Sequence, residues 1–115
     1  MLASIVVRTL NEARYLGELL DMIARQRTGE DLNHEVIVVD SGSTDGTLDI
    51  SCNAGARITH IDKSEFSFGR SLNFGCDAAR GDYLVFISGH CVPTNEHWLE
   101  ALCRPLIDGK VAYSY

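Results

Sequence analysis

The stretch VIVVDSGSTDGTLDI, residues 36–50, joins an apolar run to an amphipathic segment through a loop rich in Gly, Ser and Asp. Residues 35–40 (EVIVVD) are largely β-branched without polar alternation, which is typical of a strand buried on both faces. Ser43 stands where it would cap a helix over residues 44–52 that ends near Gly55. This stretch therefore predicts one strand, loop and helix unit of a parallel sheet.

The same unit recurs along the chain. Further strands are predicted where apolar runs return, at residues 4–8, 57–61 and 83–88. Further helices are predicted where apolar side chains recur at helical spacing, over residues 13–26, over residues 69–79 and after residue 94. Asn11 and Thr94 would cap the first and the last of these helices, and Pro105 would kink the last one. Strands that alternate with helices predict an α/β fold, a Rossmann-like α/β/α sandwich with a mostly parallel sheet.

Size and charge restrict the possible functions. The 115 residues suit one domain, and 10 basic against 16 acidic residues give a net charge of −6, which opposes nucleic-acid binding through a basic face. No apolar run approaches the roughly 20 residues of a membrane span, and no signal peptide is evident, so we expect a cytoplasmic chain. The four cysteines form no C-x-x-C pair, which favours reduced thiols. Residues 111–115 read as a strand cut short, so we expect a truncated domain.

Polar residues gather where three predicted strands end, at residues 9–12, 40–46 and 88–93. Ligands of open parallel sheets bind beyond these carboxyl ends. The Asp40 carboxylate could accept a ring N–H of a nucleobase there, or it could stabilise its own turn. Helix capping is a sufficient role for Ser43 and Asp45. The loop matches neither G-x-x-x-x-G-K-[ST] nor G-x-G-x-x-G, which disfavours a P-loop ATPase or a dinucleotide-binding enzyme.

Four segments cover nearly the whole chain: RTLNEARYL (8–16), VIVVDSGSTDGTLDI (36–50), FSFGRSLNFGCDAARGDYLVFIS (66–88) and VPTNEHWLEAL (92–102). In this order they resemble the donor-binding half of family 2 glycosyltransferases, most closely the bacterial rhamnosyltransferase-like branch. The VVDSGSTDGT string is the most specific of the matches. The resemblance implies the A-type glycosyltransferase fold. It also implies that residues 1–115 are the nucleotide-sugar-binding half, and that the half carrying the acceptor site and the catalytic base is absent.

The resemblance further implies a nucleotide pocket formed by Thr9, Glu12, Asp40, Ser41, Gly42, Arg70, Asn73 and Arg80. Thr9 and Glu12 would flank the nucleoside, and Asp40 would hold the edge of the base, with the backbone of the next two residues lying close to it. Arg70 would approach the diphosphate, and the turn at Arg80 would line the pocket. Arginine forks suit diphosphate oxygens. An exposed helix-surface position is the alternative for both arginines.

The predicted strand at residues 83–88 ends in Ser88-Gly89-His90, where family members carry an Asp-x-Asp motif that holds Mg²⁺ or Mn²⁺. The resemblance thus implies a divalent cation that stabilises the leaving nucleoside diphosphate. The His90 imidazole can ligate Mn²⁺ or a later transition metal and is a poor ligand for Mg²⁺. Two interpretations stay open: His90 contacts a metal or the diphosphate, or it is a loop histidine with a local hydrogen bond.

The resemblance implies an inverting glycosyltransferase that moves a sugar from a nucleotide-diphosphate donor to an acceptor hydroxyl. The acceptor would be a glycan or a lipid-linked sugar in cell-surface polysaccharide or glycoconjugate synthesis. The location would be cytoplasmic, with a peripheral place at the inner membrane face as a second option. Such a step needs a general base, and no residue of this chain can be assigned to it. A non-catalytic nucleotide-binding or interaction module of the same fold is the alternative. An uncovered sheet edge would also permit a homo-oligomer.

Overall fold

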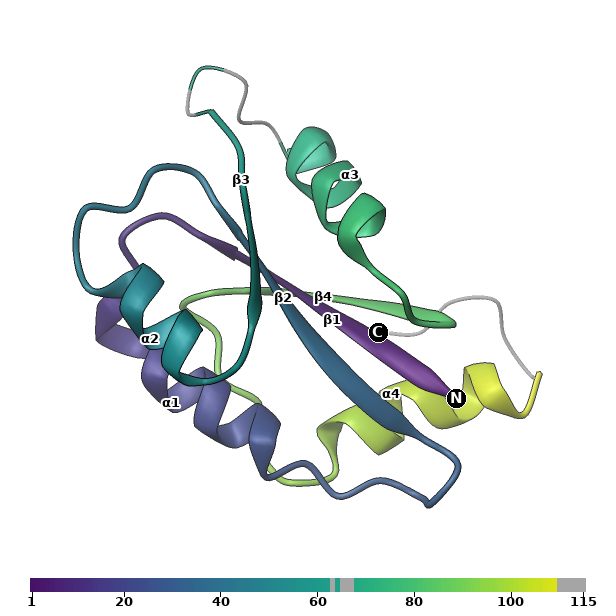
Figure 1. The fold of residues 1–115 in the computed structure, drawn as a ribbon. Coiled ribbons are helices and arrows are strands. Elements are labelled where there is room, and N and C mark those ends of the chain that lie inside the picture. The colour runs from purple at the N-terminus through teal and green to yellow at the C-terminus, as the bar shows by residue number, and fades with distance from the viewer. Residues whose placement is uncertain (63, 65–67, 110–115) are drawn as a thin grey trace.

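The computed structural model describes residues 1–62, 64 and 68–109, and within them four parallel strands form one sheet in the order β3-β2-β1-β4 (Figure 1). The strands are β1 (Leu2–Thr9), β2 (Asn33–Asp40), β3 (Arg57–His60) and β4 (Tyr83–Ser88). All four predicted strands are present. The parallel sheet that their sequence pattern predicts is confirmed.

Helices cover both faces of the sheet, as the sandwich prediction requires (Figure 1). The helices are α1 (Ala13–Ala24), α2 (Thr47–Asn53), α3 (Phe68–Ala78) and α4 (Trp98–Ile107). Apolar side chains of α1, α2 and α4 pack in one cluster with one face of the central strands. Side chains of α3 pack with the opposite face. No helix of the described residues is long and apolar enough to cross a membrane.

The central strand β1 is buried on both faces, which explains its unbroken apolar sequence. Ile5 and Val7 pack toward α1 and α4, while Val6 packs toward α3. All three are 0% exposed. A methyl group added at Gly75 of α3 would collide with the Val6 side chain, so this glycine lets α3 lie directly on β1. Burial of such side chains is the main stabilising term of the fold.

The predicted helix caps are wrong because the loops use those side chains elsewhere. Ser43 does not cap α2, which begins at Thr47, and Thr94 does not cap α4, which begins at Trp98. Asn11 also lies outside a capping position, since Glu12 is the N-terminal flanking residue of α1. None of these helix starts has a side-chain cap from its flanking residue.

One carboxylate serves two helix starts instead. Asp45 Oδ2 accepts a hydrogen bond from the backbone N–H of Ala13, the first residue of α1 (3.2 Å). Its Oδ1 accepts the N–H of Thr47, the first residue of α2 (2.9 Å). A negative charge at the amino end of a helix is stabilising. The capping role predicted for Asp45 is thus present, across two loops.

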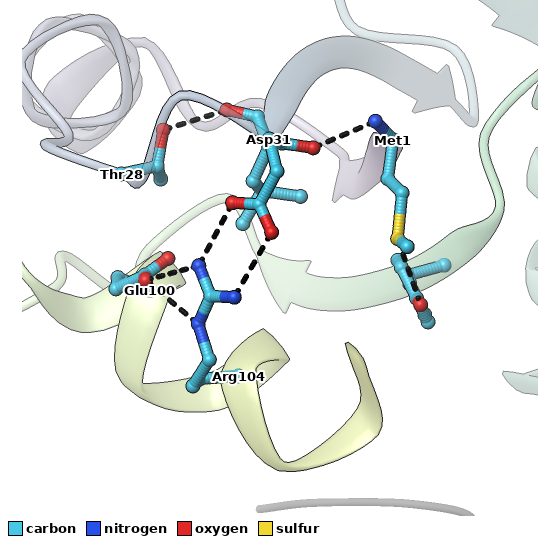
Figure 2. Close-up of polar contacts among 7 residues, drawn as sticks. Met1, Thr28, Asp31, Glu100 and Arg104 are labelled. Atoms are coloured by element: carbon cyan, nitrogen blue, oxygen red, sulfur yellow. Dashed lines mark hydrogen bonds and ion pairs between the residues drawn. The ribbon is translucent and has the colours of Figure 1, made fainter. Parts of the chain in front are cut away.

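The helix α4 is tied to the loop before β2 by Arg104 (Figure 2). Its guanidinium donates to both Asp31 oxygens (3.0 Å each) and to Glu100 Oε1 (2.6 Å from NH2). The hydrogen bond from Arg104 lowers the pKa of Asp31. The carbonyl oxygen of Asp31 also accepts the N-terminal ammonium of Met1 (2.7 Å). Pro105, the residue after Arg104, lies inside α4, as predicted.

Candidate functional site

A cavity of about 170 Å³ opens where β1 and β4 end. Its walls come from the residues at and after these two carboxyl ends: Arg8, Thr9, Leu10, Glu12, Ser88 and His90. The parallel register places Arg8 beside Ser88, so the segments that follow the two strands leave the sheet next to one another. Three residues predicted for the site, Thr9, Glu12 and His90, are thereby brought together.

A carboxylate and an imidazole face each other across this cavity. His90 Nδ1 lies 3.5 Å from Glu12 Oε1, and the two side chains are 60% and 21% exposed. Gly89 makes the approach possible, because a Cβ there would lie 2.9 Å from Glu12 Cγ and 3.0 Å from the Arg8 carbonyl oxygen. The Gly89 N–H donates to that same carbonyl (2.9 Å), which extends the β1 and β4 pairing to the cavity. The pair can offer one oxygen and one nitrogen to a ligand.

Asp40 is paired in the sheet with Thr9, a residue of the cavity wall, and is itself 0% exposed. Its Oδ1 accepts hydrogen bonds from Thr9 Oγ1 (2.7 Å) and Ser43 Oγ (2.5 Å), and its Oδ2 accepts the N–H groups of Gly42 (3.0 Å) and Ser43 (2.9 Å). Burial acts to raise the pKa of Asp40, but these hydrogen bonds, led by those from Ser43, outweigh it and lower the pKa. Such contacts match the local-turn alternative. A direct contact between Asp40 and a nucleobase stays a prediction.

The two residues after Asp40 differ in accessibility. Ser41 is buried, and both its N–H and its Oγ donate to the Thr9 carbonyl oxygen (3.1 Å each). Gly42 is exposed and adopts φ 107°, a left-handed conformation that favours glycine. A Cβ at Gly42 would meet no atom within 4 Å, so the backbone conformation, not crowding, is the reason for glycine here.

The loops that follow β1 and β2 hold each other by crossed hydrogen bonds. The Asn11 N–H donates to Ser43 Oγ (2.9 Å), and Asn11 Oδ1 accepts the Thr44 N–H (2.8 Å). The Glu12 N–H donates to Thr47 Oγ1 (3.0 Å). Asn11 adopts φ 54°, a region in which Asn is among the better-tolerated residues. The backbone that carries Glu12 into the cavity is therefore fixed from the neighbouring loop.

The other predicted residues lie outside the cavity wall. Arg70 and Asn73 are exposed on α3, the first in its opening turn. Arg80 is placed at the opposite rim of the sheet, which corrects its predicted place beside the pocket. Its N–H donates to Glu35 Oε2 (2.8 Å), and β4 begins three residues later. A residue that precedes a parallel strand lies at the amino end of the sheet, whereas the cavity lies at the carboxyl end.

Arg8 lines the cavity and was not among the predicted site residues. It is the next-to-last residue of β1, and its guanidinium donates to Ser88 Oγ (3.2 Å). The sequence carries a signal for it: a charged residue at the carboxyl end of an otherwise apolar, buried strand.

Comparison with known proteins places this chain in a family. Residues 4–115 match the model of glycosyl transferase family 2. The chain belongs to this family. Over 89 residues it is 43% identical to a PGL/p-HBAD biosynthesis glycosyltransferase of Mycobacterium tuberculosis, a match that covers 73% of this chain and 33% of the relative. The chain thus spans about a third of the length of the curated relatives that it matches first.

Solved glycosyltransferases share the fold. The mannosyltransferase PcManGT from Pyrobaculum calidifontis, in complex with GDP-Man and Mn²⁺, has a TM-score of 0.78 and 29% identity, covering 95% of this chain and 33% of its own. TarS from S. aureus, in complex with UDP-GlcNAc, has a TM-score of 0.74 and 27% identity, covering 94% and 32%. The predicted A-type glycosyltransferase fold is confirmed, and this family 2 chain covers part of it.

Proposed function

We propose that residues 1–115 form the nucleotide-sugar-binding half of an inverting glycosyltransferase. The observation that carries the proposal is the cavity where β1 and β4 end, in a family 2 chain whose structural neighbours hold UDP-GlcNAc or GDP-Man. In open parallel sheets ligands bind at this rim. A nucleoside diphosphate sugar is therefore the ligand that both the place and the family favour.

Within this proposal Glu12 and Thr9 contact the nucleoside. The Glu12 carboxylate lines the cavity and can accept hydrogen bonds from ribose hydroxyls. The Thr9 hydroxyl donates a hydrogen bond to Asp40, so Asp40 fixes the orientation of a side chain in the pocket wall. The exposed backbone at Gly42 leaves room for a base to lie close to it. Ser41 holds that backbone against β1 through its two hydrogen bonds.

Arg70 and Asn73 are proposed to reach the donor from α3. This helix follows β3, so its first turn starts on the carboxyl side of the sheet, where Arg70 lies. A guanidinium in this place suits the oxygens of a diphosphate.

A divalent cation is proposed to join Glu12 and His90 to the diphosphate. A neighbour binds Mn²⁺ together with its donor nucleotide. Two ligands at about 2.1 Å from one metal lie roughly 3–3.5 Å apart, and the 3.5 Å between His90 Nδ1 and Glu12 Oε1 fits this spacing. No group of three His, Cys, Asp or Glu ligands occurs among the described residues, so diphosphate oxygens would complete the coordination. An imidazole ligand favours Mn²⁺ over Mg²⁺.

The chemistry proposed is a single displacement at the anomeric carbon. An acceptor hydroxyl attacks, a general base takes its proton, and the nucleoside diphosphate leaves on the opposite face. We propose that the base and the acceptor site belong to the part of the relatives' length that this chain does not span. The acceptor is proposed to be a glycan or a lipid-linked sugar of cell-surface synthesis, at the cytoplasmic face of the membrane.

Thermal unfolding with UDP, GDP and dTDP, each with and without Mn²⁺, tests the proposal. A ligand at a hundredfold excess over its Kd stabilises the folded state by about 2.7 kcal/mol. We expect one nucleotide to do so, and Glu12→Gln to reduce the shift. The control is Glu18→Gln, a change of the same kind on the exposed face of α1. If none of the three nucleotides stabilises the chain, the proposal is wrong. A binding chain whose full-length protein transfers no sugar would indicate a non-catalytic module.

Self-association is proposed at the side of β4 that pairs with no described strand. Leu84 and Phe86 are 42% and 43% exposed, and β4 pairs with β1 alone among the described strands. Exposed apolar side chains on an open edge favour pairing with another chain. Light scattering is expected to show a dimer that Phe86→Lys converts to monomer, and a monomeric wild-type chain would contradict this.

A further inference from the structure

We propose that Arg8 binds the diphosphate of the nucleotide donor and is the fixed cation of this pocket. The inference rests on the proposed function and adds a residue to it. Arg8 is the next-to-last residue of β1 and lines the cavity together with Glu12 and His90.

The alternation of side chains along β1 places Arg8 on the sheet face opposite α1. Side chains of a strand alternate between the two faces of the sheet. Val7 packs with the α1 cluster, and Val6 packs with the α3 cluster. Arg8 therefore belongs to the α3 face, two residues beyond Val6 and at the rim. The long, half-buried side chain ends at the cavity wall, where it donates to Ser88 Oγ (3.2 Å).

The hydrogen bond to Ser88 orients the guanidinium at the cavity wall through an uncharged partner. A serine hydroxyl carries no charge, whereas a carboxylate at this position would form an ion pair with Arg8. The guanidinium stays protonated at every physiological pH and can present two parallel N–H donors to phosphate oxygens. Ser88 thus holds the guanidinium of Arg8 at the end of β1 and β4, beside the cavity.

The charge of the whole chain makes a local cation necessary. At a net charge of −6 the protein repels a nucleoside diphosphate, which is itself a multiple anion. Glu12 adds a negative charge to the cavity, and His90 is neutral unless it is protonated. Among the described residues that line this cavity, Arg8 is the permanently charged basic one. When no divalent cation is present, Arg8 therefore attracts phosphate from the cavity wall, and Arg70 is proposed to reach the same diphosphate from α3.

Titration calorimetry in EDTA, with uridine, UMP and UDP as probes, tests the assignment. If GDP stabilises the wild-type chain instead of UDP, the probes are guanosine, GMP and GDP. If dTDP does so, they are thymidine, dTMP and dTDP. Arg8→Gln is expected to weaken UDP binding about 10- to 100-fold, the range of a hydrogen bond to a charged group. Uridine affinity is expected to stay unchanged. The control is Arg25→Gln, which removes the same charge from the far end of α1.

Two further variants separate charge from shape. Arg8→Lys keeps the positive charge and is expected to retain more UDP affinity than Arg8→Gln. Ser88→Asp is expected to lower UDP affinity in EDTA by pairing with Arg8, again without affecting uridine. Melting temperature and circular dichroism show whether each variant is folded.

The outcomes distinguish this inference from the function on which it rests. A wild-type chain that binds none of the nucleotides overturns the proposed function and this inference with it. A wild-type chain that binds UDP, together with a folded Arg8→Gln that binds it equally well, overturns the inference alone. Equal losses for uridine and UDP in Arg8→Gln would do so too, since they would indicate a distorted pocket.

Discussion

The two rims of the sheet are both polar, yet they differ in where their polar groups point. At the amino rim Glu35 accepts hydrogen bonds from Ser4 Oγ (2.5 Å), Arg57 (2.6 Å) and the Arg80 N–H (2.8 Å). At the carboxyl rim Asp40 is satisfied in the same internal way, but Glu12 and His90 face a cavity. A gathering of polar residues is therefore common to a structural rim and a binding rim. Glu35 also lines a cavity, of about 190 Å³, so a cavity alone does not separate the two rims. The carboxyl rim differs in the carboxylate and imidazole of Glu12 and His90, 3.5 Å apart, that line its cavity together.

The largest effect is expected at the buried carboxylate of the carboxyl rim. Asp40→Ala leaves two hydroxyl groups and two backbone N–H groups without their acceptor, and we expect a loss of about 3 kcal/mol in the free energy of unfolding. Urea denaturation measures it, with the exposed Asp77→Ala on α3 as control. Nucleotide stabilisation should disappear with Asp40. Unchanged stability would show that the network around Asp40 is not as tight as its distances indicate.

The next largest loss of stability is expected at Gly81, at the amino rim, where nucleotide binding should not change. A Cβ at Gly81 would lie 2.7 Å from the Leu2 carbonyl oxygen and 2.8 Å from the Ser4 nitrogen, so backbone must shift. We expect Gly81→Ala to cost about 2 kcal/mol of stability. Nucleotide affinity of the folded fraction should stay the same. A change in that affinity would mean that the two rims are coupled.

Acid should destabilise the chain through a carboxylate at each rim. Hydrogen bonds hold the pKa of both Asp40 and Glu35 below the ordinary value, against the opposing effect of burial. A depressed pKa stabilises the folded state above the ordinary carboxyl pKa of about 4. That stability is lost as the pH falls toward the folded-state value. Melting curves from pH 6 to pH 3 should therefore show a shallower decline for Asp40→Asn and for Glu35→Gln than for the wild-type chain.

The smallest effect on stability is expected at Gly89, where the neighbours can yield. Its added Cβ would lie 2.9 Å from Glu12 Cγ, part of a side chain that can turn away, and 3.0 Å from the Arg8 carbonyl. We expect Gly89→Ala to lower stability by about 1 kcal/mol or less and to weaken nucleotide binding about tenfold. Gly81→Ala and Gly89→Ala thus form a matched pair, measured by calorimetry and urea denaturation. If both variants weakened nucleotide binding equally, the two rims would not differ in function.

The sequence predicted the strands and the layers because both depend on the local pattern. The strand at residues 35–40 is found as Asn33–Asp40, and that at 83–88 as Tyr83–Ser88. Helix starts were predicted less well. Asn11 and Ser43 bind the opposite loop, and the helix starts take their acceptor from Asp45 instead. The contact between Asp45 and Thr47 is local, but the other contacts join residues more than thirty positions apart, so local sequence does not reveal them.

The candidate site was predicted in part, and its errors have physical causes. Thr9, Glu12 and His90 line one cavity because each follows or ends a strand at the same rim. Arg80 was misplaced although it precedes β4, a position that assigns it to the amino rim. Arg8 was overlooked because it lies inside the run that defines β1. Its accessibility depends on the register with β4, which emerges from the folded sheet.

The crossed hydrogen bonds between the loops after β1 and β2 have protein groups as both donor and acceptor, so this edge of the binding surface is preorganised. An incoming donor has little backbone entropy left to remove there, and more of its interaction energy goes into affinity. Amide protons of Glu12, Ser43 and Thr44 should accordingly resist deuterium exchange in the apo protein.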